Sequence, residues 1–290
     1  MGLISDFVAG RTPPQLYQAY LSPLFETWTG ALIEALPPLG QSLDVACGTG
    51  IVTRKIVCQP NVERVVGVDL APPMIEAARA LTDPGLPVEF REGSADAIDL
   101  PGAQFDMVFC QQGLQFFPDK TAALNEACRL MKPGTKAAFS VWTSAGDGNP
   151  VFGALETIVG EQLGEDLVPF GPFSFGHKHE IEGVFDASDL TLVSLERAQR
   201  RTPLPDPRTL VLFDLLFLGR PGPDGSMQPL FAPDDSSRDE LIERIIARLS
   251  EATSDLIQPD GGLRATSSAH IMVAEKRLIG LALKKGSARV

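Results

Sequence analysis

Apolar runs alternate with helical segments over the first half of the chain. The runs lie near residues 41–47, 65–69, 87–91, 105–110 and 136–142. Short, continuous apolar runs are typical of strands buried on both faces, and the intervening helices supply the crossovers that parallel strands need. We therefore predict an α/β fold with a doubly wound, mainly parallel sheet. Ligands of such sheets bind outside the carboxyl ends of the strands.

A helix is also predicted ahead of the first strand, over residues 14–36. Aromatic and leucine side chains return on one face of this segment, and two prolines at positions 37 and 38 stop it. Beyond the fifth strand the pattern predicts helices at 150–163, 179–186, 207–218 and 239–249, with an apolar strand near 190–196. Residues 219–237, rich in Pro, Gly and Asp, are expected to be a connector.

The connection after the first strand carries the most informative motif. Residues 42–50 are Ser-Leu-Asp-Val-Ala-Cys-Gly-Thr-Gly, and the next apolar run ends in Asp69. Gly accepts dihedral angles that a Cβ forbids, so the loop backbone can pass close to a ligand while its N–H groups face that ligand. Asp69 can accept hydrogen bonds from both hydroxyls of a ribose. The pattern predicts a nucleoside-binding half-site.

The spacing of the glycines separates two classes of cofactor. A nicotinamide or flavin site needs Gly-x-Gly-x-x-Gly, but here Gly48 and Gly50 are followed by Thr53. The motif instead resembles the first motif of the class I S-adenosylmethionine-dependent methyltransferases, in which an acid and three small or tolerant positions precede Gly-x-Gly. Asp44 stands at the position of the acid, and Ala46 stands where many members have Gly.

The resemblance continues in order over about residues 14–142. It includes residues 70–79, 93–97, 105–112 and 129–142, and the N-terminal helix is similar to that of the small-molecule branch called type 11. The resemblance implies S-adenosylmethionine as the cofactor, with Met74 packed on the adenine and backbone contacts from Ser94 and Ala95. The implied cofactor-binding residues are Tyr20, Asp44, Ala46, Gly48, Gly50, Asp69, Leu70, Met74, Ser94, Ala95 and Gln111.

The same resemblance completes the domain organisation. It implies a seven-stranded sheet that closes with an antiparallel pair, which makes residues 265–274 the last strand. We expect an N-terminal helical cap over 1–36 and a cofactor-binding core over 37–203 and 263–280. Residues 204–262 would then be an insertion that forms a lid over the substrate pocket, and residues 281–290 a loose tail.

Candidates for the acceptor side are less specific. His177 and His179 lie beside Glu180 and could supply a general base, although solvated loop histidines fit the pattern as well. They could also be a metal pair as in metal-dependent catechol methyltransferases, but the required oxygen ligands cannot be placed, so no metal is predicted. The substrate-binding candidates are Tyr17, Gln115, Phe173 and Phe175.

Composition and charge exclude several partners. The chain has 290 residues and a formal net charge of −12, with no basic stripe to neutralise phosphates, so neither nucleic acid nor an anionic membrane is expected. No apolar run reaches the length of a membrane span, and the four cysteines show no paired spacing. These features favour a cytoplasmic protein with reduced thiols and a small-molecule partner, and they allow a homodimer.

The sequence thus predicts a methyltransferase that transfers a methyl group from S-adenosylmethionine to a small, apolar metabolite by in-line displacement. The alternative is an S-adenosylmethionine-binding enzyme of another reaction type, such as a cyclase or decarboxylase, on the same fold. A protein with an inactive pocket is disfavoured by the intact Asp44, Gly48, Gly50 and Asp69. A dinucleotide oxidoreductase would require nicotinamide binding.

Overall fold

The computed structural model describes residues 2–163, 171–216, 219–221, 227–229, 231 and 235–276. Its main sheet has seven strands in the order β3-β2-β1-β4-β5-β9-β6. These strands are β1 (Gly40–Val45), β2 (Val62–Asp69), β3 (Val88–Glu92), β4 (Phe105–Gln111), β5 (Met131–Trp142), β6 (Leu190–Leu204) and β9 (Leu263–Lys276). A separate two-stranded sheet pairs β7 (Gly219–Pro221) with β8 (Met227–Pro229). The predicted tail over 281–290 lies outside the described residues.

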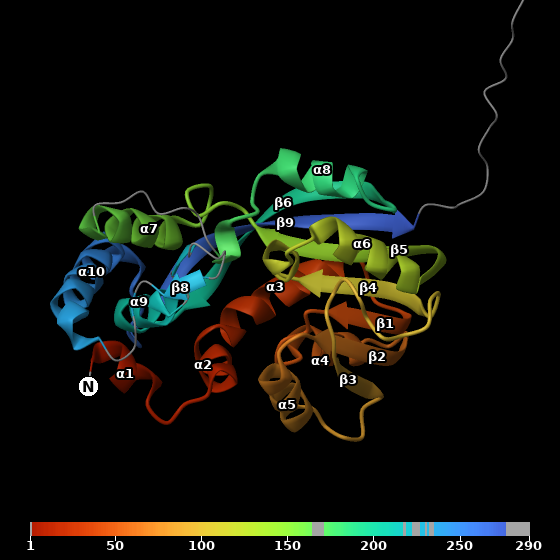
Figure 1. Ribbon diagram of the computed structural model, residues 1–290, viewed down its shortest axis with the longest axis horizontal. Helices are drawn as coiled ribbons and strands as arrows, with labels where there is room; N and C mark the ends of the chain where they lie inside the picture. The colour runs from red at the N-terminus through yellow and green to blue at the C-terminus, as the bar shows by residue number, and fades with distance from the viewer. Residues whose placement is uncertain are drawn as a thin grey trace, which may run out of the picture.

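The described helices flank the sheet and extend beyond one of its ends (Figure 1). They are α1 (Leu3–Val8), α2 (Pro13–Tyr20), α3 (Ser22–Ala35), α4 (Ile51–Val57), α5 (Pro72–Leu81), α6 (Lys120–Leu130), α7 (Pro150–Leu163), α8 (Lys178–Asp186), α9 (Pro207–Leu215) and α10 (Asp239–Ala252). Two short 3-10 turns, η1 (Leu114–Phe116) and η2 (Gly171–Phe173), lie near the carboxyl ends of β4 and β5.

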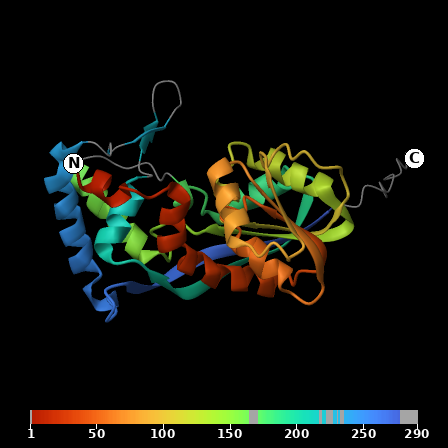
Figure 2. The ribbon, with the colours of Figure 1, turned by 90° about the horizontal axis from the view of Figure 1, so that it is seen from below.

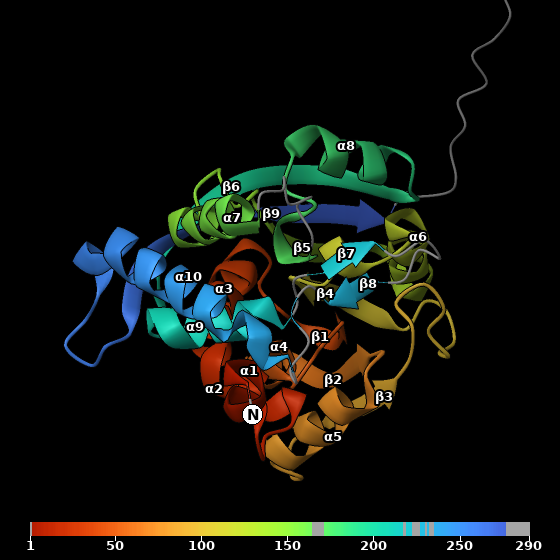
Figure 3. The ribbon, with the colours of Figure 1, turned by 60° about the vertical axis from the view of Figure 1, so that its left-hand side comes forward.

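The pairing confirms the predicted doubly wound, mainly parallel sheet. Strand β1 is parallel to both β2 and β4, and the parallel order continues to β3 on one side and β5 on the other. The last strand, β9, is antiparallel to both of its neighbours, β5 and β6. Figure 3 shows the resulting twist, with β3 and β6 at opposite edges.

Alternate residues of the central strands feed two separate apolar layers. Val65 and Phe109 belong to the larger buried cluster, whereas their neighbours Val66 and Val108 belong to a second one. Successive side chains of a strand point to opposite faces, so a continuous apolar run fills both layers. Helices α3 and α4 cover the first face, and α6 and α8 cover the second.

The predicted N-terminal helix over 14–36 is divided in two. Helix α2 ends at Tyr20 and α3 begins at Ser22, with Leu21 between them. Pro23 explains the break, because proline has no N–H for a hydrogen bond to the preceding turn and is tolerated only in the first turn of a helix. The α3 helix then ends before Pro37, as predicted, with Leu36 extended at a φ of −139°.

Helices α7, α9 and α10 form a group beside the end of the sheet, apart from α4 and α5 (Figure 2). Helices α9 and α10 come from the connection between β6 and β9, and β6 extends to Leu204, well past the strand predicted near 190–196. Helix α1 joins this group, since the Leu3 N–H donates to Asp239 Oδ1 of α10 at 3.0 Å. The N-terminal helix α1 and the connection between β6 and β9 therefore contact each other, although they are far apart in the sequence.

Trp28 fastens α3 to the sheet. Its side chain is fully buried, its indole meets Trp142 edge-on at a centroid distance of 5.5 Å, and its Nε1–H donates to Ser267 Oγ on β9 at 3.0 Å. A large aromatic ring with a satisfied N–H contributes both apolar burial and a fixed orientation. Trp28 is thus a main contact between the N-terminal helices and the last strand.

Trp28→Ala is expected to lower the free energy of unfolding by about 3–5 kcal/mol, because it removes buried apolar surface and leaves a cavity. Urea denaturation followed by circular dichroism measures the loss. The control is Leu81→Ala at a side chain that is 46% exposed, which should change stability by less than about 0.5 kcal/mol. Equal effects of the two substitutions would contradict the proposed role of Trp28.

Candidate functional site

The loop between β1 and α4 has an unusual backbone. Ala46, Gly48 and Gly50 all have positive φ, at 57°, 53° and 79°. Such angles suit Gly but are uncommon for a residue with a Cβ, so Ala46 marks local strain that the surrounding structure holds in place. Gly50 is also the N-cap of α4, and it turns the chain from the loop into the helix. The small residues predicted to matter here are needed for the shape of this turn.

The Asp69 carboxylate fixes the loop to the end of β2. Its Oδ2 accepts a hydrogen bond from the Gly48 N–H at 2.8 Å, and its Oδ1 accepts one from the Ala71 N–H at 2.9 Å. A carboxylate oxygen can accept more than one hydrogen bond, so each oxygen keeps capacity for a further donor. Asp69 is partly exposed and lines a cavity, so this capacity is open to a ligand.

Asp44 lies beneath the loop and does not line the cavity. It is fully buried, and its Oδ2 accepts the Thr53 hydroxyl at 2.6 Å, while no donor in the described ranges reaches Oδ1. Burial raises the pKa of this carboxyl to about 7, against the opposing effect of the Thr53 hydrogen bond. Asp44 therefore connects β1 to the first turns of α4 from below, instead of facing the cavity.

A cavity of about 660 Å³ opens at the carboxyl ends of β1, β2 and β4. The sequence-predicted residues that line it are Tyr17, Ala46, Gly48, Asp69, Leu70, Met74, Ser94, Ala95, Gln111, Gln115 and Phe173. They come from separate segments of the chain that only the fold brings together. Two large apolar side chains at the rim, Leu70 at 72% and Phe116 at 56% exposure, leave an unusual apolar surface open there.

Other predicted site residues lie elsewhere. Tyr20 stacks on Phe7 and meets Phe213 edge-on, and its hydroxyl accepts a hydrogen bond from Arg11. Phe175 is buried under the Lys120 ammonium, 5.0 Å from the ring centroid. Neither residue is among the described residues that line the cavity.

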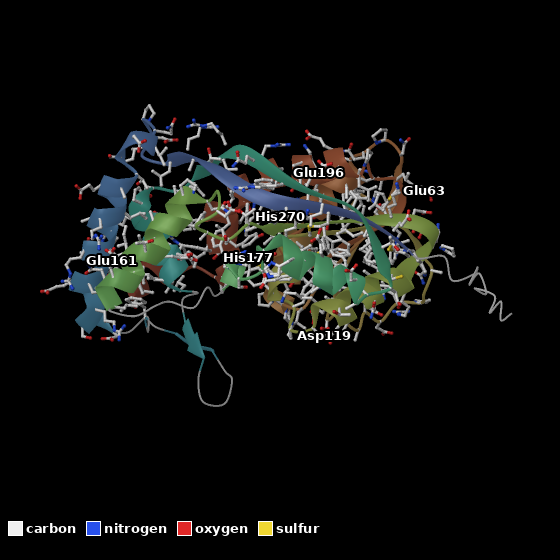
Figure 4. The ribbon with its side chains drawn as sticks, turned by 90° about the horizontal axis from the view of Figure 1, so that it is seen from above. Glu63, Asp119, Glu161, His177, Glu196 and His270 are labelled. Carbon is white, nitrogen blue, oxygen red and sulfur yellow. The ribbon has the colours of Figure 1, made fainter. Side chains whose placement is uncertain are left out.

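The two predicted histidines are also away from the cavity. His177 and His179 are exposed and stack on each other with centroids 5.7 Å apart. They lie at the N-terminal end of α8, where Figure 4 labels His177. Within the described ranges, no group of three His, Cys, Asp or Glu side chains could hold a metal ion.

One wall of the cavity is aromatic. Tyr17 stacks on Phe25 at 5.4 Å, Phe25 packs against Trp142 at 6.1 Å, and Trp142 against Phe173 at 6.3 Å, all measured between ring centroids. Phe152 of α7 extends this wall, 4.9 Å from Phe173. Burial raises the pKa of Tyr17 well above its usual value, so its hydroxyl keeps its proton. The wall is suited to a flat or apolar molecule.

Several cavity residues were missed at the sequence level. They are Leu24, Phe25, Gln112, Trp142, Leu210 and Asp214. Gln112 stands beside the predicted Gln111 and has a positive φ of 53°, which no sequence pattern reveals. Asp214 gave a usable signal, because it is the only acid inside the apolar run from Leu210 to Leu216.

The charged side chains that line the cavity are all acidic. They are Asp69, Asp96, Asp119 and Asp214, and no Lys, Arg or His is present among the described lining residues. A cavity with this charge disfavours anionic ligands and favours neutral or cationic ones. It therefore differs from a phosphate-binding site of a dinucleotide enzyme, which needs groups that stabilise negative charge.

The comparison with protein families agrees with this geometry. The family model described as a methyltransferase domain, type 11, matches residues 43–139, which contain the loop, Asp69, strands β2 to β4 and parts of β1 and β5. Residues 43–139 are therefore similar to a type 11 methyltransferase domain. The matched region holds the nucleoside side of the cavity, whereas α7, α9 and α10 lie outside it.

Curated methyltransferases resemble part of the chain. A demethylmenaquinone methyltransferase of Thermus thermophilus is 39% identical over 93 residues, which are 32% of this chain and 42% of that protein. A ubiquinone biosynthesis O-methyltransferase of Xanthomonas euvesicatoria is 33% identical over 132 residues, which are 44% of this chain and 52% of that protein. The chain thus spans about half the length of these curated relatives.

Solved structures support the methyltransferase fold. The YcgJ protein of Bacillus subtilis has a TM-score of 0.54 at 18% identity and covers 86% of this chain and 98% of its own. A phosphoethanolamine N-methyltransferase of Haemonchus contortus, in complex with S-adenosylhomocysteine, has a TM-score of 0.55 at 17% identity, over 96% of this chain and 61% of its own.

None of the helices in the described part of this chain combines the length and apolar character needed to cross a bilayer.

The raised pKa of Asp44 predicts a pH-dependent effect of Asp44→Asn. An unfolded Asp has a pKa of about 3.9, so with a folded value of about 7 the folded state binds more protons in between, and stability falls as pH rises through this window. The amide oxygen of Asn can still accept the Thr53 hydroxyl, and the variant lacks the buried charge.

We expect Asp44→Asn to raise the melting temperature by about 3 °C or more at pH 8, with the gain shrinking toward pH 4. Thermal melts of the variant and the parent across this range measure it. Asp99→Asn, at an exposed carboxyl, serves as the control. A difference that does not change with pH would contradict the assigned pKa.

Proposed function

We propose that the protein is an S-adenosylmethionine-dependent methyltransferase that acts on a small, largely apolar acceptor. The observation that carries the proposal is a single cavity that extends from the Gly48 loop and Asp69 to the aromatic wall. The first part resembles a nucleoside site, and the second can enclose an acceptor beside it. The matched relatives are named as a demethylmenaquinone methyltransferase and a ubiquinone biosynthesis O-methyltransferase, which supports a small-molecule acceptor.

The residues at the nucleoside end fit the cofactor. Asp69 keeps hydrogen-bonding capacity for the two ribose hydroxyls, and the exposed Leu70 beside Met74 offers an apolar surface for the adenine ring. Gly48 leaves room for the ligand, since a Cβ there would meet only the Tyr17 hydroxyl, at 3.9 Å. When bound, S-adenosylmethionine would supply a methyl group that its positive sulfur already activates for displacement.

The chain's own contribution is to bind, orient and exclude water. Trp142, Phe25 and Phe173 present apolar faces to the acceptor side, and aromatic faces also favour a cationic centre. Alignment of the two reactants in a dry cavity supplies much of the rate enhancement of a displacement reaction. Helix α9, which lies in the insertion predicted over 204–262, contributes Leu210 and Phe213 to this part of the cavity.

The charge of the chain supports the choice of acceptor. A net charge of −12, and a cavity whose described charged side chains are all acidic, both oppose a nucleic-acid partner, which would need basic side chains along its phosphates. The proposal is tested directly by isothermal titration with S-adenosylmethionine, S-adenosylhomocysteine and NADPH. Binding of the first two alone supports it, and binding of NADPH alone would contradict it.

Asp69→Ala should weaken S-adenosylhomocysteine binding by about 1.5–3 kcal/mol, the range for hydrogen bonds to a charged group, which is about ten- to a hundredfold in Kd. Isothermal titration measures the change, and Asp69→Asn should lie between the variant and the parent because it keeps one acceptor oxygen. Asp99→Ala is the control at an exposed position. An unchanged affinity in a folded Asp69→Ala protein would remove Asp69 from the ribose site.

A further inference from the structure

Two glutamine side chains in the cavity have no hydrogen-bond partner. Gln112 is 5% exposed and Gln115 is 4% exposed, and neither the amide nitrogen nor the oxygen of either side chain is paired with any described residue. Both residues line the cavity. A buried, unpaired amide is costly to the folded state, whereas an apolar side chain of similar size would fit without this cost. The two amides are therefore placed to bind polar groups of a ligand.

The backbone at Gln112 supports the same conclusion. Its φ of 53° is uncommon for a residue with a Cβ, and its N–H is held by Ser140 O at 2.9 Å, at the end of the neighbouring strand β5. Strained residues of this kind persist where the surrounding structure over-determines them, and they gather at functional sites. This conformation is part of the turn after β4, and it sets the direction in which the Gln112 side chain leaves the backbone.

Asp214 brings a carboxylate to the same cavity. It lies in the last turn of α9, and within the described ranges no donor or cation contacts its oxygens. A negative charge at a helix C-terminus is unfavourable, because the unpaired carbonyl groups there already carry partial negative charge. Desolvation, with a smaller effect of Glu156 on α7, raises the pKa of Asp214 to about 7. An acid in this position destabilises the fold, so a role in binding would explain it.

Among the residues that the structure describes, no cation offsets this charge. Arg208 of α9 forms an ion pair with Glu243 of α10, and Arg248 of α10 forms one with Glu161 of α7. Arg244 donates to Gln162, and Asp239 accepts from the Leu3 backbone. The remaining ionisable groups on the helices packed against α9 are Asp6 on α1, Tyr17 and Tyr20 on α2, and Glu240 and Glu251 on α10.

We propose that the acceptor is a neutral aromatic molecule carrying a hydroxyl or another hydrogen-bond donor, that Gln112, Gln115 and Asp214 bind its polar groups, and that Asp214 excludes acceptors with a carboxylate or phosphate group. The aromatic wall binds the ring, and the glutamine amides provide both donors and acceptors for its substituents. Asp214 accepts a hydrogen bond from a neutral donor group and repels an anion. This inference rests on the proposed function, since it concerns the acceptor side of the same cavity.

The test uses two probes of the same shape, 2-naphthol and 2-naphthoate, titrated into the full chain saturated with S-adenosylhomocysteine. We expect 2-naphthol to bind at pH 6 and pH 8, and 2-naphthoate to bind about tenfold more weakly at pH 8 than at pH 6. The carboxylate of the probe stays ionised over this range, so the change reports the ionisation of the protein. Asp214→Asn should remove the pH dependence and bind 2-naphthoate about tenfold more tightly than the parent at pH 8.

Gln115→Met, which keeps the volume of the side chain, should weaken 2-naphthol binding about fivefold without changing the pH dependence of 2-naphthoate binding. The control is Glu240→Gln, which neutralises an exposed acid on α10 and should change neither probe. Asp214→Asn should also melt at a higher temperature than the parent at pH 8, which shows that it is folded.

Three results would overturn the inference. They are equal binding of the two probes by the parent at pH 8, an unchanged preference in Asp214→Asn, and no binding of 2-naphthol to the S-adenosylhomocysteine complex. Failure to bind S-adenosylhomocysteine at all would instead contradict the proposed function. The proposed function and this inference about the acceptor are thus tested by separate measurements on the same sample.

Discussion

The carboxylate of Asp69 holds together the two segments on which the cavity is built. By accepting from Gly48 and Ala71, it joins the loop after β1 to the loop after β2. The strained turn at Ala46 then lies close to the turn after β4, where a Cβ on Gly113 would come within 2.7 Å of the Ala46 Cβ. Gln112 precedes this glycine. The contacts that fix the nucleoside end of the cavity therefore also fix the position of Gln112 at the acceptor end.

The fold was largely predictable because its strands are buried on both faces. Apolar runs at 65–69 and 105–110 left few alternatives to a parallel sheet, and their positions agree with β2 and β4 to within a few residues. The break at Leu21 was missed, although Pro23 was visible, because the apolar positions keep a helical period across it. The spacing of apolar residues predicts which face of a helix is buried, but it does not predict a break that costs a single backbone hydrogen bond.

The cavity was predictable where a motif fixes the backbone, and less so where packing decides. Ala46, Gly48 and Asp69 follow from the loop sequence, and all three line the cavity. On the acceptor side, His177 has the right chemistry but lies exposed at the start of α8, whereas Asp214 lies in an otherwise apolar helix and lines the cavity. Distance along the chain says nothing about which of them reaches the site, since α8 and α9 pack against different parts of the fold.

The place of β9 in the sheet has a consequence for how the protein is made. It is the last strand in the described part of the chain, yet it pairs with β5 on one side and with β6 on the other. During synthesis both neighbours leave the ribosome before it and present open backbone edges that only residues 263–276 can cover. Nascent chains that stall before this point would carry exposed, adhesive strands, so chaperone protection and uninterrupted translation matter most over the final third of the chain.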